Sequence, residues 1–505
     1  MTTGRPMLAS RYAAWLTGAV GLAVALRAPF VFDTPEPDEG GYLLVARNWH
    51  VGDATLYGRY WVDRPPLLLL LYKAADGWGR YGVRMLGCLA VVVLVLAAGA
   101  AARAVAGRRA SVIAACVAAA LGSSYALAAY EVDGELLAAA LVMTSCALTL
   151  WAVYRTHAAG TRLVASVLAG IAAVAAIATK QNFADGLVFA VALLAACRVA
   201  GSPERRRLGA VLAGGVAGAG IALGALAVWV LTSGVGIADL AYATYGFRLD
   251  GDRVIGEGPI GAPAERVGVL LLMAVVSGLV ALIVLFVVTS RGRLRDGDPV
   301  SRAVAVMGAF GVVGVVAGGS YWPHYLIQLV PAAALGAGLV SDRPSAATWA
   351  RRCAALAVSA SLVASCVGAV LGAGPGAPEA SVQTMGHWLH RSAHRGDTVV
   401  VTYGHANVLL ESGLVSPYPY LWSLPTRVRD PRLELLTRTL SGPRAPTWVV
   451  EWNGFDSWGL DRHHRLAAVV RRRYHRVASL CGHEVYLLDS RRREPAAASG
   501  PCGEV

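Results

Sequence analysis

The stretch "YAAWLTGAVGLAVALRAPFVFDTPEPDEGGYLLVA", Tyr12 to Ala46, joins two unlike patterns. Residues 12–32 are almost entirely apolar, and about 20 apolar residues in a helix suffice to cross a hydrocarbon layer of about 30 Å. Three acids, Glu36, Asp38 and Glu39, follow closely. The apolar run is longer than the core of a typical signal peptide, and no A-x-A-like cleavage site separates it from the acids. We therefore expect a retained transmembrane helix with an acidic cluster just beyond its end.

Similar apolar runs recur along the chain. The 505 residues are 56% hydrophobic and only 15% charged, with a mean hydropathy of +0.53, which excludes an ordinary soluble protein. The pattern predicts an α-helical polytopic membrane protein with about eleven spans. The expected spans are residues 12–32, 83–102, 110–129, 134–154, 163–179, 183–200, 209–232, 266–290, 302–318, 322–341 and 350–373.

The chain becomes polar after the last of these runs. We expect two domains, a membrane domain at 1–374 with a long outer loop at 33–82, and a soluble domain at 375–505. Three segments of the soluble part, 397–404, 445–453 and 483–490, have the composition of short strands, whereas "HRLAAVVRRRYH", 464–475, has that of a helix. This alternation predicts a small α/β domain. It contains only two cysteines, Cys481 and Cys502, which could pair in an oxidising compartment or stay free.

The formal charge of +13 does not require a nucleic-acid partner, because the arginines gather in short gaps between apolar runs. If the N-terminus is cytoplasmic, every short basic turn falls on the cytoplasmic side, as the positive-inside rule predicts. We expect a multi-pass protein of the plasma membrane, in contact with lipid, whose other loops and C-terminal domain are extracytoplasmic.

Acidic and basic residues that could take part in a reaction lie in these outer loops. Asp38 and Glu39 would be held near the membrane surface, where a carboxylate could act as general base on a lipid-linked headgroup. Alternatively they are solvated charges or cap a helix that begins near Gly41. In "YWVDRPPLLLLLY", Tyr60 to Tyr72, Arg64 follows Asp63 and could bind phosphate bidentately or anchor at lipid headgroups. The run "LLLLLY", Leu67 to Tyr72, is too short to cross the membrane and predicts an interfacial helix.

Two further loops carry polar clusters. "YEVDGELL", Tyr130 to Leu137, contains three acids that could orient acceptor hydroxyls, hold a divalent cation, or cap the following helix: Glu131, Asp133 and Glu135. In "ATKQNFADG", Ala178 to Gly186, Lys180 is one of only two lysines in the chain. A lysine at the outer end of a helix runs against the positive-inside tendency, so it either binds phosphate or snorkels to the interface.

The last cluster is "GGSYWPHYLIQLVP", Gly318 to Pro331. His324 and Gln328 stand four residues apart and would share one face of an α-helix, where they could touch a headgroup. An interfacial belt of Trp and Tyr explains the aromatic residues equally well. Metal binding by His324 with Asp63 is weakly indicated, so the metal stays unknown.

These fragments together resemble the GT-C glycosyltransferases, and specifically the PMT-like or family 39 group of protein O-mannosyltransferases and aminoarabinose transferases. The resemblance covers about residues 10 to 341. Its carriers are "DEGGYLLVA" (38–46), "DRPPLLLLLY" (63–72), "VDGELL" (132–137), "TKQN" (179–182) and "WPHYLIQLVP" (322–331). This chain has Arg64 where the group commonly has lysine or histidine, and the part from Pro375 onward matches nothing assigned.

The resemblance implies an inverting transfer of a sugar from a polyprenyl-phosphate donor to an acceptor hydroxyl of the cell envelope, outside the membrane. Asp38 matches the catalytic acid of the first outer loop, with Glu39 and Asp133 as further catalytic candidates. Arg64 and Lys180 would bind the donor phosphate. The expected substrate-binding residues are Asp63, Glu135, Gln181, His324 and Tyr325.

Two other classes of function fit a helical membrane protein with a few polar residues. A lipid or glycan transporter is one, although such proteins tend to have repeated halves and midplane sites, and here no repeat is evident. The other is a noncatalytic envelope-assembly protein whose soluble part binds a partner.

Overall fold

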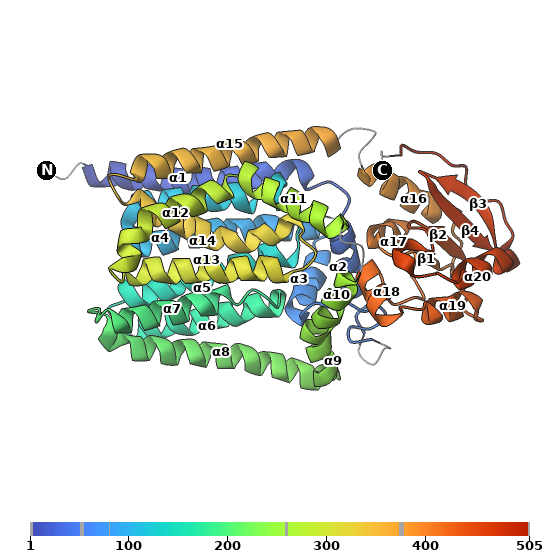
Figure 1. Cartoon of the computed structure of the whole chain (residues 1–505), viewed down its shortest axis with the longest axis horizontal. Coiled ribbons are helices and arrows are strands. Elements are labelled where there is room, and N and C mark those ends of the chain that lie inside the picture. The colour runs from blue at the N-terminus through green and yellow to red at the C-terminus, as the bar shows by residue number, and fades with distance from the viewer. Residues whose placement is uncertain (1–3, 51–54, 80, 258–260, 373–377, 503–505) are drawn as a thin grey trace.

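The structure is a computed structural model that describes residues 4–50, 55–79, 81–257, 261–372 and 378–502. Long helices lie side by side in a bundle, and a smaller unit of helices and strands covers one end of it (Figure 1). We call residues 378–502 the C-terminal unit and the end of the bundle that it covers the outer end. The N-terminal helix begins at the opposite end.

The apolar runs form the helices of the bundle. Their bounds are α1 (Gly4–Arg27), α4 (Gly82–Gly122), α5 (Gly134–Tyr154), α6 (Ala159–Thr179), α7 (Asp185–Val199), α8 (Arg205–Ser233), α11 (Gly261–Val276), α12 (Leu279–Arg295), α13 (Pro299–Ala317), α14 (Val330–Ser341) and α15 (Ala347–Gly372). Among the described residues, eight helices are long and apolar enough to cross a membrane, or nine if the bent pair 263–276 and 279–295 is one span. The chain is thus an α-helical polytopic protein.

The expected number of about eleven differs from this count for two reasons. Helix α4 contains two of the expected spans, because Gly107 (φ +82°) reverses the chain inside it. The two limbs pack together, and Ser111 Oγ donates a hydrogen bond to the Gly99 carbonyl at 2.7 Å. The second reason is helix α7, which has 15 residues and is therefore shorter than a full membrane span. The second limb of α4 ends at Gly122 rather than at residue 129, because Ala128 adopts a left-handed conformation (φ +49°) that closes a short 3₁₀ turn, η2 (Tyr125–Leu127).

Short helices at the outer end carry the loop residues. Helix α2 (Pro37–Arg47) begins with Pro37 and a capping box formed by Glu36 and Glu39. Helix α3 (Pro66–Asp76) also begins with a proline and includes the expected interfacial segment. Its Leu68 and Leu69 are buried against the bundle. The remaining outer elements are η1 (Ala28–Phe30), α9 (Ile237–Ala241), the π-helix η3 (Tyr242–Gly246), α10 (Phe247–Gly256) and the 3₁₀ helix η4 (Pro323–Leu329).

The C-terminal unit contains a four-stranded sheet in the order β1-β2-β4-β3. Strands β1 and β2 are parallel, and the other pairs are antiparallel. The three predicted strands correspond to β1 (Val399–Val401), β2 (Trp448–Glu451) and β4 (His483–Leu488), whereas β3 (Tyr474–Leu480) was not predicted. The helices are α16 (Pro378–Ser392), α17 (Ala406–Ser412), α18 (Ser423–Arg429), α19 (Glu434–Ser441), α20 (Arg465–Arg473) and the 3₁₀ turns η5 (Ser457–Gly459) and η6 (Asp489–Arg491). A disulfide joins Cys481 and Cys502.

The C-terminal unit packs directly on the loop that contains α2. Asn407 Nδ2, on α17, donates a hydrogen bond to the Pro35 carbonyl at 3.1 Å, and a Cβ on Gly40 would lie 2.8 Å from Cα of Asn407. The Ser416 backbone N–H donates to Tyr60 Oη at 2.9 Å. The predicted boundary between residues 374 and 375 lies outside the described residues, so the division into two domains stays a prediction.

Candidate active site

Asp38 lies in the first turn of α2, where the helix dipole favours a carboxylate. Its Oδ2 accepts a hydrogen bond from Tyr42 Oη at 3.1 Å, and its Oδ1 accepts one from Trp422 Nε1 at 2.7 Å. Arg64 Nη2 lies 3.9 Å from Oδ2. The Asp38 side chain remains 31% exposed. A hydroxyl group can therefore approach a carboxylate that is already held in one orientation.

Glu39, the next residue, is fully buried and occupied by partners. Its Oε2 lies 2.7 Å from Arg84 Nη2 and accepts the Glu36 N–H at 2.9 Å. Its Oε1 accepts the Val132 N–H at 2.9 Å. These contacts tie α2 to the loop that precedes α5. The geometry favours a positioning role, and a catalytic role for Glu39 stays a prediction.

Asp63 holds two arginines side by side. Arg64 Nη1 lies 2.7 Å from its Oδ1, and Arg248 Nη2, from α10, lies 2.7 Å from its Oδ2. Arg64 Nε also donates to Tyr42 Oη at 2.8 Å. Burial alone would raise the pKa of Asp63, but the charges of Arg248 and Arg64 outweigh burial and place this pKa below its usual value. Two guanidinium groups are thus fixed close to the acid of α2.

Lys180 follows the end of α6 and is buried. Its Nζ lies 2.7 Å from Glu135 Oε1 and 5.9 Å from the centre of the Tyr325 ring. Gln181 Nε2 donates a weak hydrogen bond to the Asp63 backbone carbonyl at 3.4 Å. The residues predicted from three separate loops therefore meet in one cluster.

His324, from η4, lies among the acids of the loop before α5. Its Nδ1 is 3.3 Å from Asp133 Oδ2 and 4.0 Å from Glu131 Oε2, and its Nε2 is 3.9 Å from Glu135 Oε1. Asp133 precedes α5, but its side chain makes no capping hydrogen bond. Burial, and then the charge of neighbouring carboxylates, raises the pKa of Glu131 and of Asp133 well above the usual range.

The same three groups have the arrangement of a cation site. Ligand atoms of Glu131, Asp133 and His324 lie within 4.8 Å of one another. Within the described part of the chain, neither oxygen of Asp133 has a hydrogen-bond partner. Two carboxylates and an imidazole are a suitable donor set for a divalent ion. Of the open alternatives for these acids, the geometry thus favours cation binding or acceptor contact over helix capping for Asp133.

The prediction that His324 and Gln328 share a face is wrong, because η4 is a 3₁₀ helix. Such a helix has about three residues per turn, so positions four apart diverge. Gln328 instead faces α7, where its Nε2 donates to Asp185 Oδ2 and its Oε1 accepts from Asn182 Nδ2, both at 2.9 Å. Gln328 fastens η4 to the turn that carries Lys180.

Three residues of the cluster were not predicted. Tyr42 could have been found, since it lies four residues after Asp38 on the same helix face. Arg248 had no comparable signal, because the loop 233–265 contains several charges without a pattern. Trp422 lies 384 residues from its partner Asp38, and no local pattern could have linked the two.

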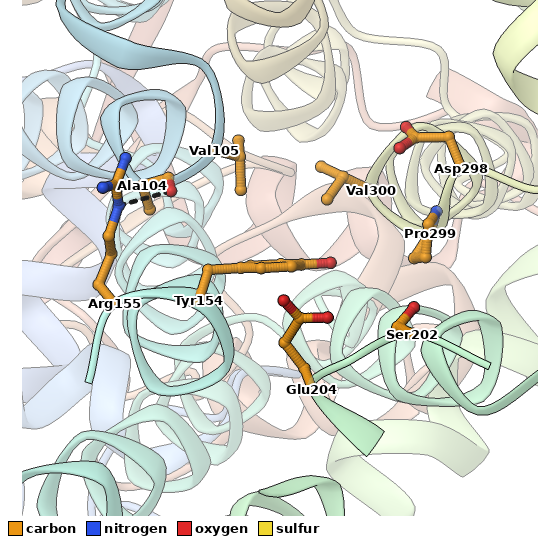
Figure 2. A pocket seen from close by; sticks show the side chains of 9 residues that line it. All are labelled: Ala104, Val105, Tyr154, Arg155, Ser202, Glu204, Asp298, Pro299 and Val300. Atoms are coloured by element: carbon orange, nitrogen blue, oxygen red, sulfur yellow. Dashed lines mark hydrogen bonds between the residues drawn. The ribbon is translucent and has the colours of Figure 1, made fainter. Parts of the chain in front are cut away.

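A cavity of about 440 Å³ lies at the other end of the bundle. Figure 2 shows Tyr154 and Arg155 at the end of α5, Ser202 and Glu204 before α8, and Asp298 before α13 around it. These residues come from turns that the basic-loop pattern groups on one side. The cavity shares no residue with the cluster around Asp38.

Solved structures share this arrangement of helices. No family model and no curated protein sequence matches the chain. Among solved structures, ArnT from Cupriavidus metallidurans bound to undecaprenyl phosphate matches with a TM-score of 0.60 at 15% identity, over 96% of this chain and 98% of that one. The chain has the GT-C fold.

Archaeal structures of the GT-C fold match as well. The Archaeoglobus fulgidus oligosaccharyltransferase tethered with an acceptor peptide has a TM-score of 0.54 at 12% identity, over 92% of this chain and 72% of that one. The AglB structure with an inhibitory peptide and a dolichol-phosphate has a TM-score of 0.54 at 13% identity, over 95% and 75%. The narrower PMT-like grouping stays a prediction.

Proposed function

We propose that this protein transfers a sugar from a polyprenyl-phosphate donor to an acceptor hydroxyl on the outer face of the plasma membrane, with inversion at the anomeric carbon. The observation that carries the proposal is the partly exposed carboxylate of Asp38 beside Arg64, which Asp63 holds together with Arg248. Lys180 completes the set from another loop. A base next to buried cations suits a reaction in which a proton is removed while a phosphate departs.

In the proposed step the acceptor oxygen attacks the anomeric carbon, and the bond from that carbon to the phosphate oxygen breaks. Asp38 takes the proton of the acceptor hydroxyl. The polyprenyl phosphate leaves with the bonding electron pair, so its charge grows during the reaction. Arg64, Arg248 and Lys180 stabilise that charge, and a strong general acid is not needed.

Carboxylates that do not react hold the cations in position through ion pairs. Asp63 fixes Arg64 and Arg248, and Glu135 fixes Lys180. An arginine has five N–H donors, so each guanidinium can keep Asp63 and still bind phosphate oxygens. Gln181, His324 and Tyr325 border the same cluster and are proposed to contact the substrate. A divalent ion held by Glu131, Asp133 and His324 would supply further positive charge beside the reacting groups.

The fold comparison supports a lipid-linked donor. One neighbour contains undecaprenyl phosphate and another contains a dolichol-phosphate. Both match nearly the whole of this chain, 96% and 95% of it. We place the acceptor in the cell envelope because the cluster and the C-terminal unit share the end of the bundle away from the basic turns.

The test uses purified protein in lipid with a panel of radiolabelled polyprenyl-phosphate sugars, both hexoses and pentoses, and an envelope extract as acceptor. Wild-type protein should release free polyprenyl phosphate and transfer label from at least one donor. Asp38→Asn should lower turnover by at least about 100-fold, the usual contribution of a general base, while donor binding persists.

Asp76→Asn is the matched control, because Asp76 forms an ion pair with Arg47 at the same end of the bundle, away from the cluster. It should transfer at the wild-type rate. Wild-type turnover by Asp38→Asn would remove Asp38 as the base. Folded wild-type protein that releases no polyprenyl phosphate from any donor would favour transport or assembly instead.

A further inference from the structure

The C-terminal unit contributes a side chain to the cluster around Asp38. Trp422 precedes α18, and its indole Nε1 donates a hydrogen bond to Asp38 Oδ1 at 2.7 Å. An indole N–H can only donate a hydrogen bond. The contact therefore orients the carboxylate and does not compete with it for the proton of the substrate hydroxyl. Together with Tyr42 on Oδ2, it fixes both oxygens of the carboxylate.

Packing holds the Trp422 ring in this position. A Cβ added to Gly41 would overlap the ring, so the absence of a side chain at residue 41 lets the ring lie against α2. The Tyr42 and Trp422 rings also contact each other, with centroids 5.7 Å apart. One helix turn therefore carries the acid, the glycine that admits the indole, and the tyrosine that supports it.

Neighbouring backbone contacts keep the segment before α18 on the first outer loop. The Trp61 N–H donates to the Pro419 carbonyl at 3.0 Å, and the Ser416 N–H donates to Tyr60 Oη at 2.9 Å. The Trp61 and Tyr420 rings lie 6.4 Å apart. Trp422 thus reaches Asp38 from a segment fastened at several points to the loop that also carries Asp63 and Arg64.

We propose that Trp422 is a positioning residue for Asp38, so that the C-terminal unit completes the active site rather than only selecting the acceptor. This inference rests on the proposed function, in which Asp38 is the base. A hydrogen bond to a carboxylate favours its charged form and restricts its rotation. Removing the bond should therefore let the carboxylate rotate and should slow turnover.

The experiment measures kcat and the KM for donor of Trp422→Phe in lipid. We expect kcat to fall on the order of tenfold, the effect of losing one hydrogen bond to a charged group, with the KM for donor within about twofold of wild type. The other groups that act on Asp38, one on α2 and the rest on other segments, are unchanged by this substitution: Tyr42, Arg64, Tyr72, Asp133 and His324.

Two further variants separate the possible results. Trp458→Phe is the control, because Trp458 is an exposed tryptophan elsewhere in the C-terminal unit, and it should behave as wild type. Gly41→Ala keeps Trp422 but displaces its ring, so it should reproduce the slower turnover with a KM for donor close to that of the wild type.

Wild-type kcat in folded Trp422→Phe, with Asp38→Asn inactive, would overturn the positioning role and leave the proposed function standing. If Trp422→Phe does not fold, wild-type kcat in Gly41→Ala overturns it equally. Full activity of Asp38→Asn would overturn both proposals.

Discussion

Lys180 and Glu135 form a buried ion pair in the cluster around Asp38, and this pair allows a direct test of donor binding. Lys180→Ala should weaken binding of a polyprenyl-phosphate sugar by about 10- to 100-fold, since it removes a charged partner of the phosphate. It should also lower stability by about 3–5 kcal/mol, because Glu135 is left buried without its cation. Donor titration and thermal unfolding measure the two effects separately.

The double variant Lys180→Ala with Glu135→Gln distinguishes these effects. The neutral amide that replaces the Glu135 carboxylate should restore much of the stability, because no unpaired charge remains buried. Donor affinity should stay low. Affinity that recovers together with stability would show that Lys180 has only a structural role.

His324 permits a test for a cation that does not depend on turnover. Mn²⁺ should raise the melting temperature of the wild-type protein, because a ligand that binds only the folded state stabilises it, by about 2.7 kcal/mol at one hundred times its Kd. His324→Ala should lose this shift, since one of the three donors is gone.

His387→Ala is the matched variant for this experiment. His387 lies 3.6 Å from Glu411 in the C-terminal unit and its side chain is 52% exposed. It should keep the Mn²⁺ shift. Equal shifts in all three proteins would mean that the ion binds elsewhere.

The loop after β1 is an element whose stability should depend on pH. His405 lies in a left-handed conformation at the start of α17 and packs on Trp452, whose other neighbour is His483. Burial, and then the charge of His483, lowers the pKa of His405 to about 4 from an ordinary value of 6.5. The unfolded chain therefore binds a proton between these values when the folded chain does not.

The contribution of neutral His405 to the free energy of unfolding should be fully present above about pH 6.5. It should be lost as the pH falls toward 4, which lowers the free energy of unfolding by up to about 3 kcal/mol. The melting temperature of His405→Gln should thus vary less over this window than that of the wild type. His463→Gln, at an exposed position of the same unit, should follow the wild type. Parallel curves for wild type and His405→Gln would contradict the assignment.

The helices of the bundle could be predicted because each is a long apolar run that can be recognised in the sequence without knowledge of its tertiary contacts. Shorter elements depended on tertiary contacts. Strand β3 was missed because the helical pattern of 464–475 continues into it, and the chain leaves the helix at Tyr474, where pairing with β4 takes over. The 3₁₀ form of η4 was missed because Pro323 and the contacts of Gln328 override the spacing of its polar residues.

The candidate site divides in the same way. Residues such as Asp38, Asp63, Arg64 and Lys180 could be selected because charge next to an apolar run is unusual. Arg248 and Trp422 could not be selected, since their significance comes only from which residues lie beside them in space.

At the scale of the whole molecule, the two ends of the bundle predict its orientation. The basic turns gather at the end with the cavity of Figure 2, and the Asp38 cluster lies at the other. We expect that a cysteine replacing exposed Ser441 reacts with a membrane-impermeant maleimide in intact cells. A cysteine replacing exposed Arg206 should react only after permeabilisation. Labelling of the unaltered protein gives the background, and the reverse pattern would invert the topology.

The sequence separation of 384 residues from Asp38 to Trp422 also sets an order of events during biosynthesis. The acid leaves the ribosome early, whereas the indole that holds it is made after every membrane helix has been completed. A nascent or truncated chain would therefore contain the reactive carboxylate without its support. Under the proposed function, a full-length chain would begin to use the lipid-linked donor only after the C-terminal unit has been exported and has docked.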